Sequence, residues 1–282
     1  MTPASRSVNV VALARPQLEL SGPKLAHALE VLITGCEEHG GIERFVEALR
    51  LKAEIFQEAF APGRAPGLPA LRALCAHLAT VRRRIGEHLL PSRFEELRAR
   101  IARLLESRED TSSTDQRIAA FCGGFPADRE HRWVRDLAAE LLHNVDPDRY
   151  PLMCRWVWDA TANTGVIREI WHAPDADPLR IEIPDGYGTF VMLREELAQF
   201  LTKNGIFRDV PFYVDLLTAQ VYAGYINAQG GAYLRTDFSV PEDPLLHTRR
   251  LLGLDGVDAN GRTRLKAPDG IAAVVDDPKL SD

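Results

Sequence analysis

The sequence lacks the short motifs that identify the commonest enzyme classes. It has no glycine-rich loop ending in Gly-Lys-Ser/Thr, no Gly-x-Gly-x-x-Gly, no Gly-x-Ser-x-Gly and no set of protein-kinase motifs. Each of these motifs builds a particular site, such as a phosphate cradle or a nucleophile on a sharp turn. The sequence therefore gives no support for a nucleotide-dependent enzyme or a common hydrolase, and no cofactor is evident.

Cysteine is also scarce. The four cysteines, Cys36, Cys75, Cys122 and Cys154, are widely spaced, with no Cys-x-x-Cys pair and no Cys/His spacing typical of zinc sites. This spacing predicts reduced thiols in a cytoplasmic protein. Other donors surround the middle of the chain, but their spacing matches no helical metal-binding pattern, so no metal site is predicted; they are His131, His143, His172, Glu130, Asp136, Asp146 and Asp159.

Long apolar runs and an overall positive charge are missing as well. One weakly apolar run, Val8 to Ala14, is shorter than a membrane span and is followed by Arg15-Pro16, which predicts neither export nor membrane insertion. The net charge of −6 argues against a general nucleic-acid binder. Residues 72–108 nevertheless hold nine arginines and four glutamates. They are interpreted as a solvated helix face with i,i+4 ion pairs. The alternative is a docking face for an acidic partner or a phosphate backbone, through Arg72, Arg82, Arg83 and Arg84.

The residue pattern predicts an α+β protein, predominantly α-helical with one small β-hairpin. Apolar residues recur at helical spacing in most of the chain, in the ranges 24–38, 42–60, 70–90, 92–105, 116–122, 127–143, 152–162, 190–203, 211–228 and 245–252. Alternating apolar and polar residues at 166–172 and 179–183 predict the hairpin. We expect an N-terminal helical region (1–110) and a C-terminal helical region (111–282) with a loose tail from about residue 253.

The stretch from Leu141 to Gly165 concentrates aromatic and charged residues, and all four tryptophans lie in or beside it. One interpretation is structural: a tight turn that caps the next helix and fills the core. The other is a pocket in which arginines clamp an anion and indoles exclude water, formed by Arg149, Tyr150, Arg155, Trp156 and Trp158.

Cys122 is the candidate thiol. If a helix begins near Ala127, Cys122 lies just before its N-terminus, where the backbone dipole favours a thiolate. No His, Lys or second Cys is adjacent in sequence to activate it. The alternative is therefore a buried structural cysteine that precedes a turn.

Two resemblances bear on function. A helix, a Pro-Asp-Arg-Tyr-Pro turn and a second helix resemble the segment after the hairpin in helix-hairpin-helix DNA-glycosylase-like proteins, with 121–126 as the hairpin. The chain departs from that family because it has no Leu-Pro-Gly-x-Gly hairpin, no adjacent lysine nucleophile and no iron–sulfur cysteine cluster.

The second resemblance rests on three runs: Arg-Tyr-Pro-Leu-Met-Cys-Arg-Trp-Val-Trp-Asp (149–159), Asn-Thr-Gly-Val-Ile-Arg-Glu-Ile-Trp (163–171) and Gln-Gly-Gly-Ala-Tyr-Leu-Arg-Thr-Asp-Phe (229–238). With them, residues 133–256 resemble an uncharacterised protein that accompanies cytoplasmic heterodisulfide-reductase-like sulfur-oxidation systems of bacteria. The resemblance implies a soluble accessory of a thiol-handling assembly. We therefore expect an accessory or protein-interaction component, not a self-contained enzyme. The alternatives are a helix-hairpin-helix-like DNA-binding or glycosylase-like protein and an anion-binding thiol enzyme.

Overall fold

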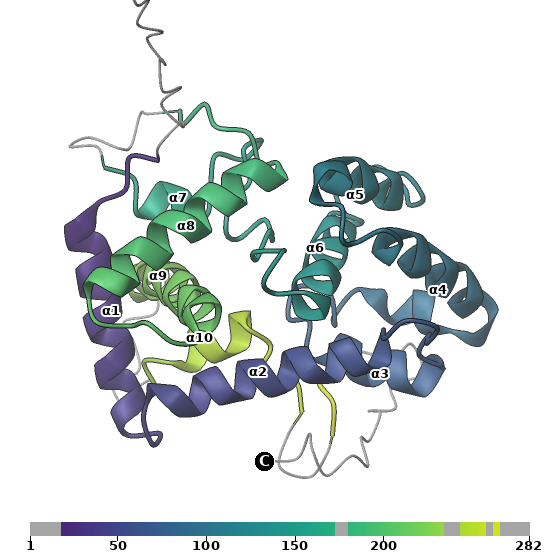
Figure 1. Cartoon of the computed structure of the whole chain (residues 1–282), viewed down its shortest axis with the longest axis horizontal. Coiled ribbons are helices and arrows are strands. Elements are labelled where there is room, and N and C mark those ends of the chain that lie inside the picture. Colours follow the sequence, from purple (N-terminus) through teal and green to yellow (C-terminus); the bar gives the residue numbers. More distant parts are fainter. Residues whose placement is uncertain (1–17, 173–179, 234–242, 258–261, 266–282) are drawn as a thin grey trace, which may run out of the picture.

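Helix α2 (Ile42–Ala59) is the element along which the rest of the molecule is arranged. The computed structural model describes residues 18–172, 180–233, 243–257 and 262–265. Figure 1 shows α2 running along one edge of the molecule, from one group of helices to the other. It packs against both α6 (Trp133–Val145) and α9 (Val210–Tyr233), which belong to different groups.

The two groups contain the other helices. On the side of α9 lie α1 (Gly22–Glu37), α7 (Val166–Glu169), α8 (Tyr187–Lys203) and α10 (Leu246–Leu251). On the side of α6 lie α3 (Leu68–Ala76), α4 (Pro91–Leu105), α5 (Thr114–Cys122) and the short 3₁₀ helices η1 (Ile85–Leu89) and η2 (Thr111–Ser113). Because α1 packs against α9, the first helix of the chain contacts the C-terminal region directly.

Local sequence explains most of these helices. In α2 the buried residues Ile42, Phe45, Leu49 and Phe56 recur every three to four positions, which puts them on one face. Proline stands in the first turn of α1, α3 and α4, where its missing N–H costs no hydrogen bond. The prediction of a predominantly α-helical protein is confirmed.

The structure shows no β-hairpin among the described residues of 166–183, so that prediction is wrong there; residues 173–179 lie outside the described part. Val166 begins the helical turn α7. The amides of Val166 and Ile167 donate to the carbonyls of Trp156 and Val157, at 3.2 and 3.3 Å. Trp171 forms an isolated bridge with Leu20, which lies far away in the sequence. The alternation of apolar and polar residues in this segment reflects which side chains are buried. It does not mark a strand, because no neighbouring strand among the described residues pairs with it.

The helix predicted at 152–162 is also wrong, because these residues form turns. Gly165 has φ 122°, a conformation that other residues rarely adopt, and a Cβ there would lie 2.7 Å from the Val157 carbonyl oxygen. The chain folds back on itself at this glycine, and Asp159 and Thr164 form a bridge. This reversal of the chain direction stands in place of the helix predicted at 152–162.

Several boundaries differ from those predicted. The helix expected at 70–90 ends at Ala76, and the helix expected from 127 begins at Trp133. The loose tail expected from residue 253 is wrong for the residues that the structure describes. Gly253 packs so closely on α3 that a Cβ would lie 1.8 Å from the His77 carbonyl oxygen. Residues 253–257 are therefore part of the fold.

Candidate functional site

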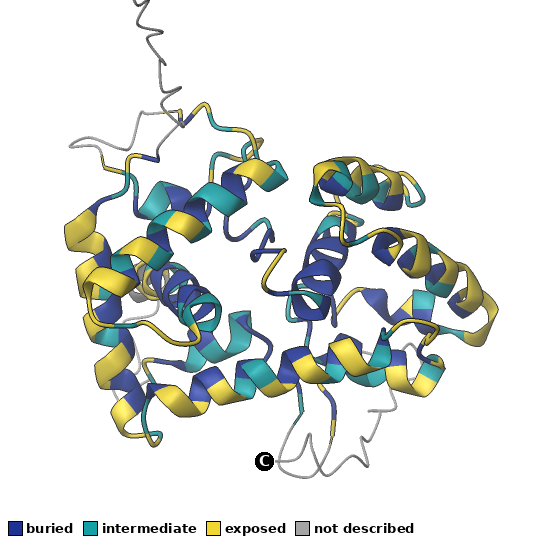
Figure 2. Ribbon diagram, viewed as in Figure 1, coloured by how far each residue is buried: buried dark blue, intermediate teal, exposed yellow. Residues whose placement is uncertain are grey.

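A row of buried polar residues follows α6. Asp136, Glu140, His143 and Asn144 recur at helical spacing, so their side chains share one stripe. All residues of α6 except Arg135 are buried, and Figure 2 shows the helix dark blue over nearly its whole length. Burying a charged group is unfavourable unless it is paired, so the partners of this row determine its energetic cost.

Glu140 is paired with Lys52 of α2. Lys52 Nζ lies 3.7 Å from Glu140 Oε2 and donates to the carbonyl of Leu252 at 2.9 Å. The Thr80 hydroxyl donates to the other carboxylate oxygen of Glu140 at 3.2 Å. Burial lowers the pKa of Lys52 and raises the pKa of Glu140, and each partner's charge opposes that shift. This pair connects α6 with α2 and with the end of α10.

His143 is paired with Asp215 of α9. Its Nε2 atom lies 3.1 Å from Asp215 Oδ2, within ion-pair distance but without good hydrogen-bond geometry. Its Nδ1 atom lies 2.7 Å from the Tyr150 carbonyl oxygen. Burial opposes a charge on His143, but the Asp215 carboxylate and the Tyr150 carbonyl outweigh burial, so the pKa of His143 is raised. The His143–Asp215 pair therefore links the α6 group to the α9 group. We call the Lys52–Glu140 and His143–Asp215 pairs the buried polar network.

The five residues of the predicted anion pocket lie beside this network. Arg155 donates to Asp136 at 2.8 Å, and Arg149 donates to Asp146 at 2.5 Å. Tyr150 and Trp158 have no exposed surface, and Trp156 is 7% exposed. The rings fill the core, as in the structural interpretation, and both arginines are paired with carboxylates. Asp159 pairs with Arg132 instead, and in the described chain that follows α6 no helix begins before Val166.

Cys122 does not have the environment expected of an activated thiol. It is the last residue of α5, and the next helix begins only at Trp133, so the expected position before a helix N-terminus is wrong. Burial raises the pKa of Cys122, with a smaller opposing effect from Arg135. Burial also raises the pKa of Cys36 and Cys75 to about 12, and raises that of Cys154 well above its ordinary value. The neutral thiol is favoured at all four positions.

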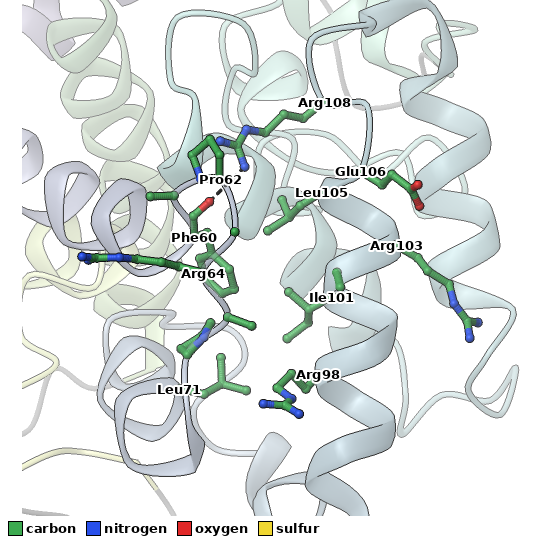
Figure 3. Close-up of a pocket in the computed structure, with 15 residues that line it drawn as sticks. Phe60, Pro62, Arg64, Leu71, Arg98, Ile101, Arg103, Leu105, Glu106 and Arg108 are labelled. Carbon is green, nitrogen blue, oxygen red and sulfur yellow. Dashed lines mark hydrogen bonds between the residues drawn. The ribbon is translucent and has the colours of Figure 1, made fainter.

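The structure does contain a surface pocket, at a place that the sequence did not indicate. It has a volume of about 360 Å³ and lies between α4 and the connector from α2 to α3. Figure 3 shows its apolar lining, formed by Phe60, Leu71, Ile101 and Leu105. We call this the α4 pocket. Its connector wall is formed by residues 61–66, which are rich in proline and glycine.

Two arginines lie next to this apolar lining. In Figure 3 the guanidinium groups of Arg98 and Arg108 lie toward opposite ends of the pocket. Arg103 and Glu106 point away from it, on the outer side of α4, and Arg64 extends away on the connector side. A guanidinium group therefore lies at each end of the pocket.

Tyr150 holds the Arg108 end in place. Its hydroxyl donates to the Arg108 carbonyl and accepts from Arg117 Nη2 at 2.7 Å. Arg117 also donates to the Leu104 carbonyl at 2.9 Å, at the end of α4. Arg108 in turn donates to the Phe60 carbonyl at 3.1 Å, across the pocket wall. The stretch from Leu141 to Gly165 thus holds the Arg108 end of the α4 pocket in place through Tyr150.

The predicted basic face of residues 72–108 is largely used internally. Arg82 is buried and pairs with Asp255 at 2.8 Å, and Arg72 donates to the Leu89 carbonyl at 2.9 Å. Arg98 and Arg100 form ion pairs with glutamates one turn away, as the helix-face interpretation predicted. Of the four arginines predicted to face a phosphate backbone, Arg83 and Arg84 are exposed, Arg72 is half-buried and Arg82 is buried.

Among the described residues, no group of three or more His, Cys, Asp or Glu side chains is arranged to hold a metal ion. No helix in the same part of the chain has both the length and the apolar character needed to cross a membrane. Comparison of the chain with family models, with curated proteins and with solved structures finds no match.

Proposed function

We propose that this protein is a protein-binding accessory component of a cytoplasmic bacterial assembly, with the α4 pocket as its binding site. The observation that carries the proposal is the pocket itself, an opening on the surface with an apolar lining. Fully desolvated apolar anchors contribute most of the energy in protein interfaces, and such anchors need a pocket to fill. The volume of about 360 Å³ is at the lower end of the range for small-molecule sites, about 300–1,000 Å³, and it also suits a partner's side chains.

The state of the ionisable side chains supports an interaction role over catalysis. General acid–base catalysis needs groups that reach a substrate. Glu140, His143 and Asp215 are instead buried: Glu140 pairs with Lys52, and His143 pairs with Asp215. A nucleophilic thiol needs a lowered pKa, and burial raises it for each cysteine.

The resemblance of residues 133–256 to the protein of the heterodisulfide-reductase-like sulfur-oxidation systems suggests which assembly this is. We propose such a thiol-handling system as the setting. The residues that carry the resemblance include Tyr150, whose hydroxyl supports the Arg108 end of the α4 pocket. The segment that suggested the assembly therefore also supports the proposed binding site.

A native pull-down with two matched variants tests the proposal. Ala102 is an exposed residue of α4 that lines the pocket, and Ala99 is an exposed residue of the same helix that does not. Full-length tagged protein is isolated from native extract with its partners, which are identified by mass spectrometry. We expect Ala102→Trp to fill the pocket and lose a specific partner that Ala99→Trp retains.

Two results would overturn the proposal. One is a partner set that Ala102→Trp leaves unchanged, because binding would then occur elsewhere. The other is the absence of any partner enriched above an untagged control. Partners that belong to sulfur oxidation support the proposed assembly, and partners from an unrelated system exclude it while leaving the binding role intact.

A further inference from the structure

We infer that the α4 pocket binds an extended protein segment in which an apolar side chain is flanked on both sides by carboxylates. This inference rests on the proposed function and adds the chemistry of the partner. Three features carry it: the apolar lining, the two arginines at its ends, and the hydrogen-bonding capacity that those arginines retain.

The lining determines what enters the pocket. Phe60, Leu71, Ile101 and Leu105 are all less than 9% exposed, so they form the packed base of the pocket and not a protruding patch. Their side chains offer no hydrogen bond, so the group that displaces water from them is apolar. The binding energy comes from burial, about 25 cal/mol for each Å² of apolar surface removed from water.

The arginines determine what flanks that group. Arg98 uses one guanidinium nitrogen to bond Glu95 at 2.5 Å, and Arg108 uses one to bond the Phe60 carbonyl at 3.1 Å. A guanidinium has five N–H donors in a planar fork that matches a carboxylate. Each arginine therefore keeps donors for a partner. The Arg98 side chain is 41% exposed and that of Arg108 is 21% exposed, so both remain accessible.

The length of α4 along the pocket sets the length of the bound segment. Arg98 and Leu105, the last residue of α4, are seven positions apart, which is about 10 Å along the helix axis. An extended segment advances about 3.3 Å for each residue. A segment of three to four residues, on the order of 10 Å long, would therefore span this part of α4, with a carboxylate near the arginine at each end of the pocket. The apolar side chain would lie between them.

A nucleic acid fits this site less well. Phosphate backbones are held by a continuous series of cations, whereas the space between Arg98 and Arg108 is lined by aliphatic and aromatic carbon. Arg64 and Arg103 point away from the pocket in Figure 3.

Fluorescence anisotropy with the full-length protein tests the inference. Three labelled peptides share a central leucine and carry glutamate, glutamine or lysine on both sides; a single-stranded oligonucleotide is the fourth probe. We expect the glutamate peptide to bind about tenfold more tightly than the glutamine peptide. That advantage should shrink as salt rises from about 50 mM to about 300 mM, because partly exposed ion pairs are screened.

Matched variants assign the binding to the pocket. Ala102→Trp should abolish binding of the glutamate peptide, and Ala99→Trp should preserve it. Arg98→Gln should remove most of the glutamate preference. Arg93→Gln should leave it, because Arg93 belongs to the same helix but does not line the pocket.

The outcomes separate this inference from the proposed function. If the native partner is lost with Ala102→Trp but the glutamate and lysine peptides bind equally, the binding role stands and the acidic specificity is wrong. Tighter binding of the oligonucleotide through the same residues would also overturn the inference. If no peptide binds and no partner depends on Ala102, both proposals fail.

Discussion

The buried polar network and the α4 pocket use charged residues in opposite ways. In the network, Lys52, Glu140, His143 and Asp215 are each at most 7% exposed and are paired with one another. At the pocket, Arg98 and Arg108 keep exposed surface beside an apolar lining. The difference indicates that residue type alone does not identify a functional site. Whether a charged group keeps accessible surface beside its existing partners decides whether it can bind something else.

The two regions are nevertheless physically connected through Tyr150. Its carbonyl lies 2.7 Å from His143 Nδ1, and its hydroxyl donates to the Arg108 carbonyl. One residue therefore contacts the network with its backbone and the pocket wall with its side chain. Changes in the network should affect stability first, and changes near the pocket should affect binding first.

The largest effect on stability should come from breaking the Lys52–Glu140 pair. Lys52→Met leaves a buried carboxyl without its cationic partner, and we expect it to lower the free energy of unfolding by about 3 kcal/mol. The double variant Lys52→Met/Glu140→Leu should recover a large part of that loss, since an apolar pair of similar volume replaces two buried charges. Urea unfolding followed by circular dichroism measures both. A double variant as unstable as Lys52→Met would contradict a role of charge pairing.

The next effect should depend on pH and on His143. The pKa of His143 is raised in the folded state, so the stabilisation from its protonation is complete below the ordinary histidine pKa of about 6.5 and is lost as pH rises through the folded-state pKa. Stability should fall in that interval by at most about 1.4 kcal/mol per pH unit. His143→Gln should remove this part of the pH dependence, measured by urea unfolding at a series of pH values.

The control for this prediction is His27→Gln, because His27 is an exposed residue of α1. Its pH profile should match that of the unmodified protein. A His143→Gln profile that also matches it would show that the His143–Asp215 pair does not supply the pH dependence.

A smaller effect should follow from Tyr150→Phe, which removes the hydroxyl and keeps the ring. We expect a loss of about 1–2 kcal/mol, because the substitution removes two intramolecular hydrogen bonds, one donated to Arg108 and one accepted from Arg117. The variant should also increase hydrogen exchange in residues 106–110, which the hydroxyl helps to hold, and weaken binding at the α4 pocket. Loss of stability without faster exchange in this segment would mean that Tyr150 acts only in the core.

Ala102→Trp should change stability very little. Ala102 is exposed, and substitutions at such positions usually alter the free energy of unfolding by less than about 0.5 kcal/mol. Thermal unfolding of this variant and of Ala99→Trp should agree closely. A marked destabilisation by Ala102→Trp alone would mean that the pocket closes in solution and that the binding comparison needs a smaller substitution.

The smallest expected effect is the slow chemical labelling of the Cys122 thiol. Because burial raises the pKa of this thiol, iodoacetamide should label it slowly near neutral pH and faster only above the ordinary thiol pKa of about 8.5. Peptide mapping by mass spectrometry gives the rate. Rapid labelling at neutral pH would restore the hypothesis of an activated thiol.

Prediction from the sequence succeeded where local spacing controls the structure. The apolar spacing of α2 and the prolines at the start of α1, α3 and α4 depend on residues within a few positions of one another. It failed at 166–171, where the alternating pattern has no strand partner nearby and Trp171 pairs with Leu20. A periodic pattern reports burial, but only a neighbour supplied by the fold makes it a strand.

The candidate site shows the same limit. Sequence reasoning identified Tyr150, His143, Asp136 and Arg155 as unusual residues in the right part of the chain, yet it could not pair Lys52 with Glu140 or Asp215 with His143. Those partners lie on different helices, and no spacing rule links them. The α4 pocket left no signal either, because its connector wall has the composition of an ordinary linker.

By itself, the sequence determined that this chain is mainly helical, where most of its helices lie, and that it lacks the short motifs of the common nucleotide-dependent and hydrolase sites. Those properties follow from local spacing and from residue types. The tertiary structure decided which charges are neutralised and which stay accessible, because pairing and burial depend on contacts between residues far apart in the chain. It thereby turned the tryptophan-rich stretch into support for a binding pocket formed mainly by α4 and the connector that precedes α3.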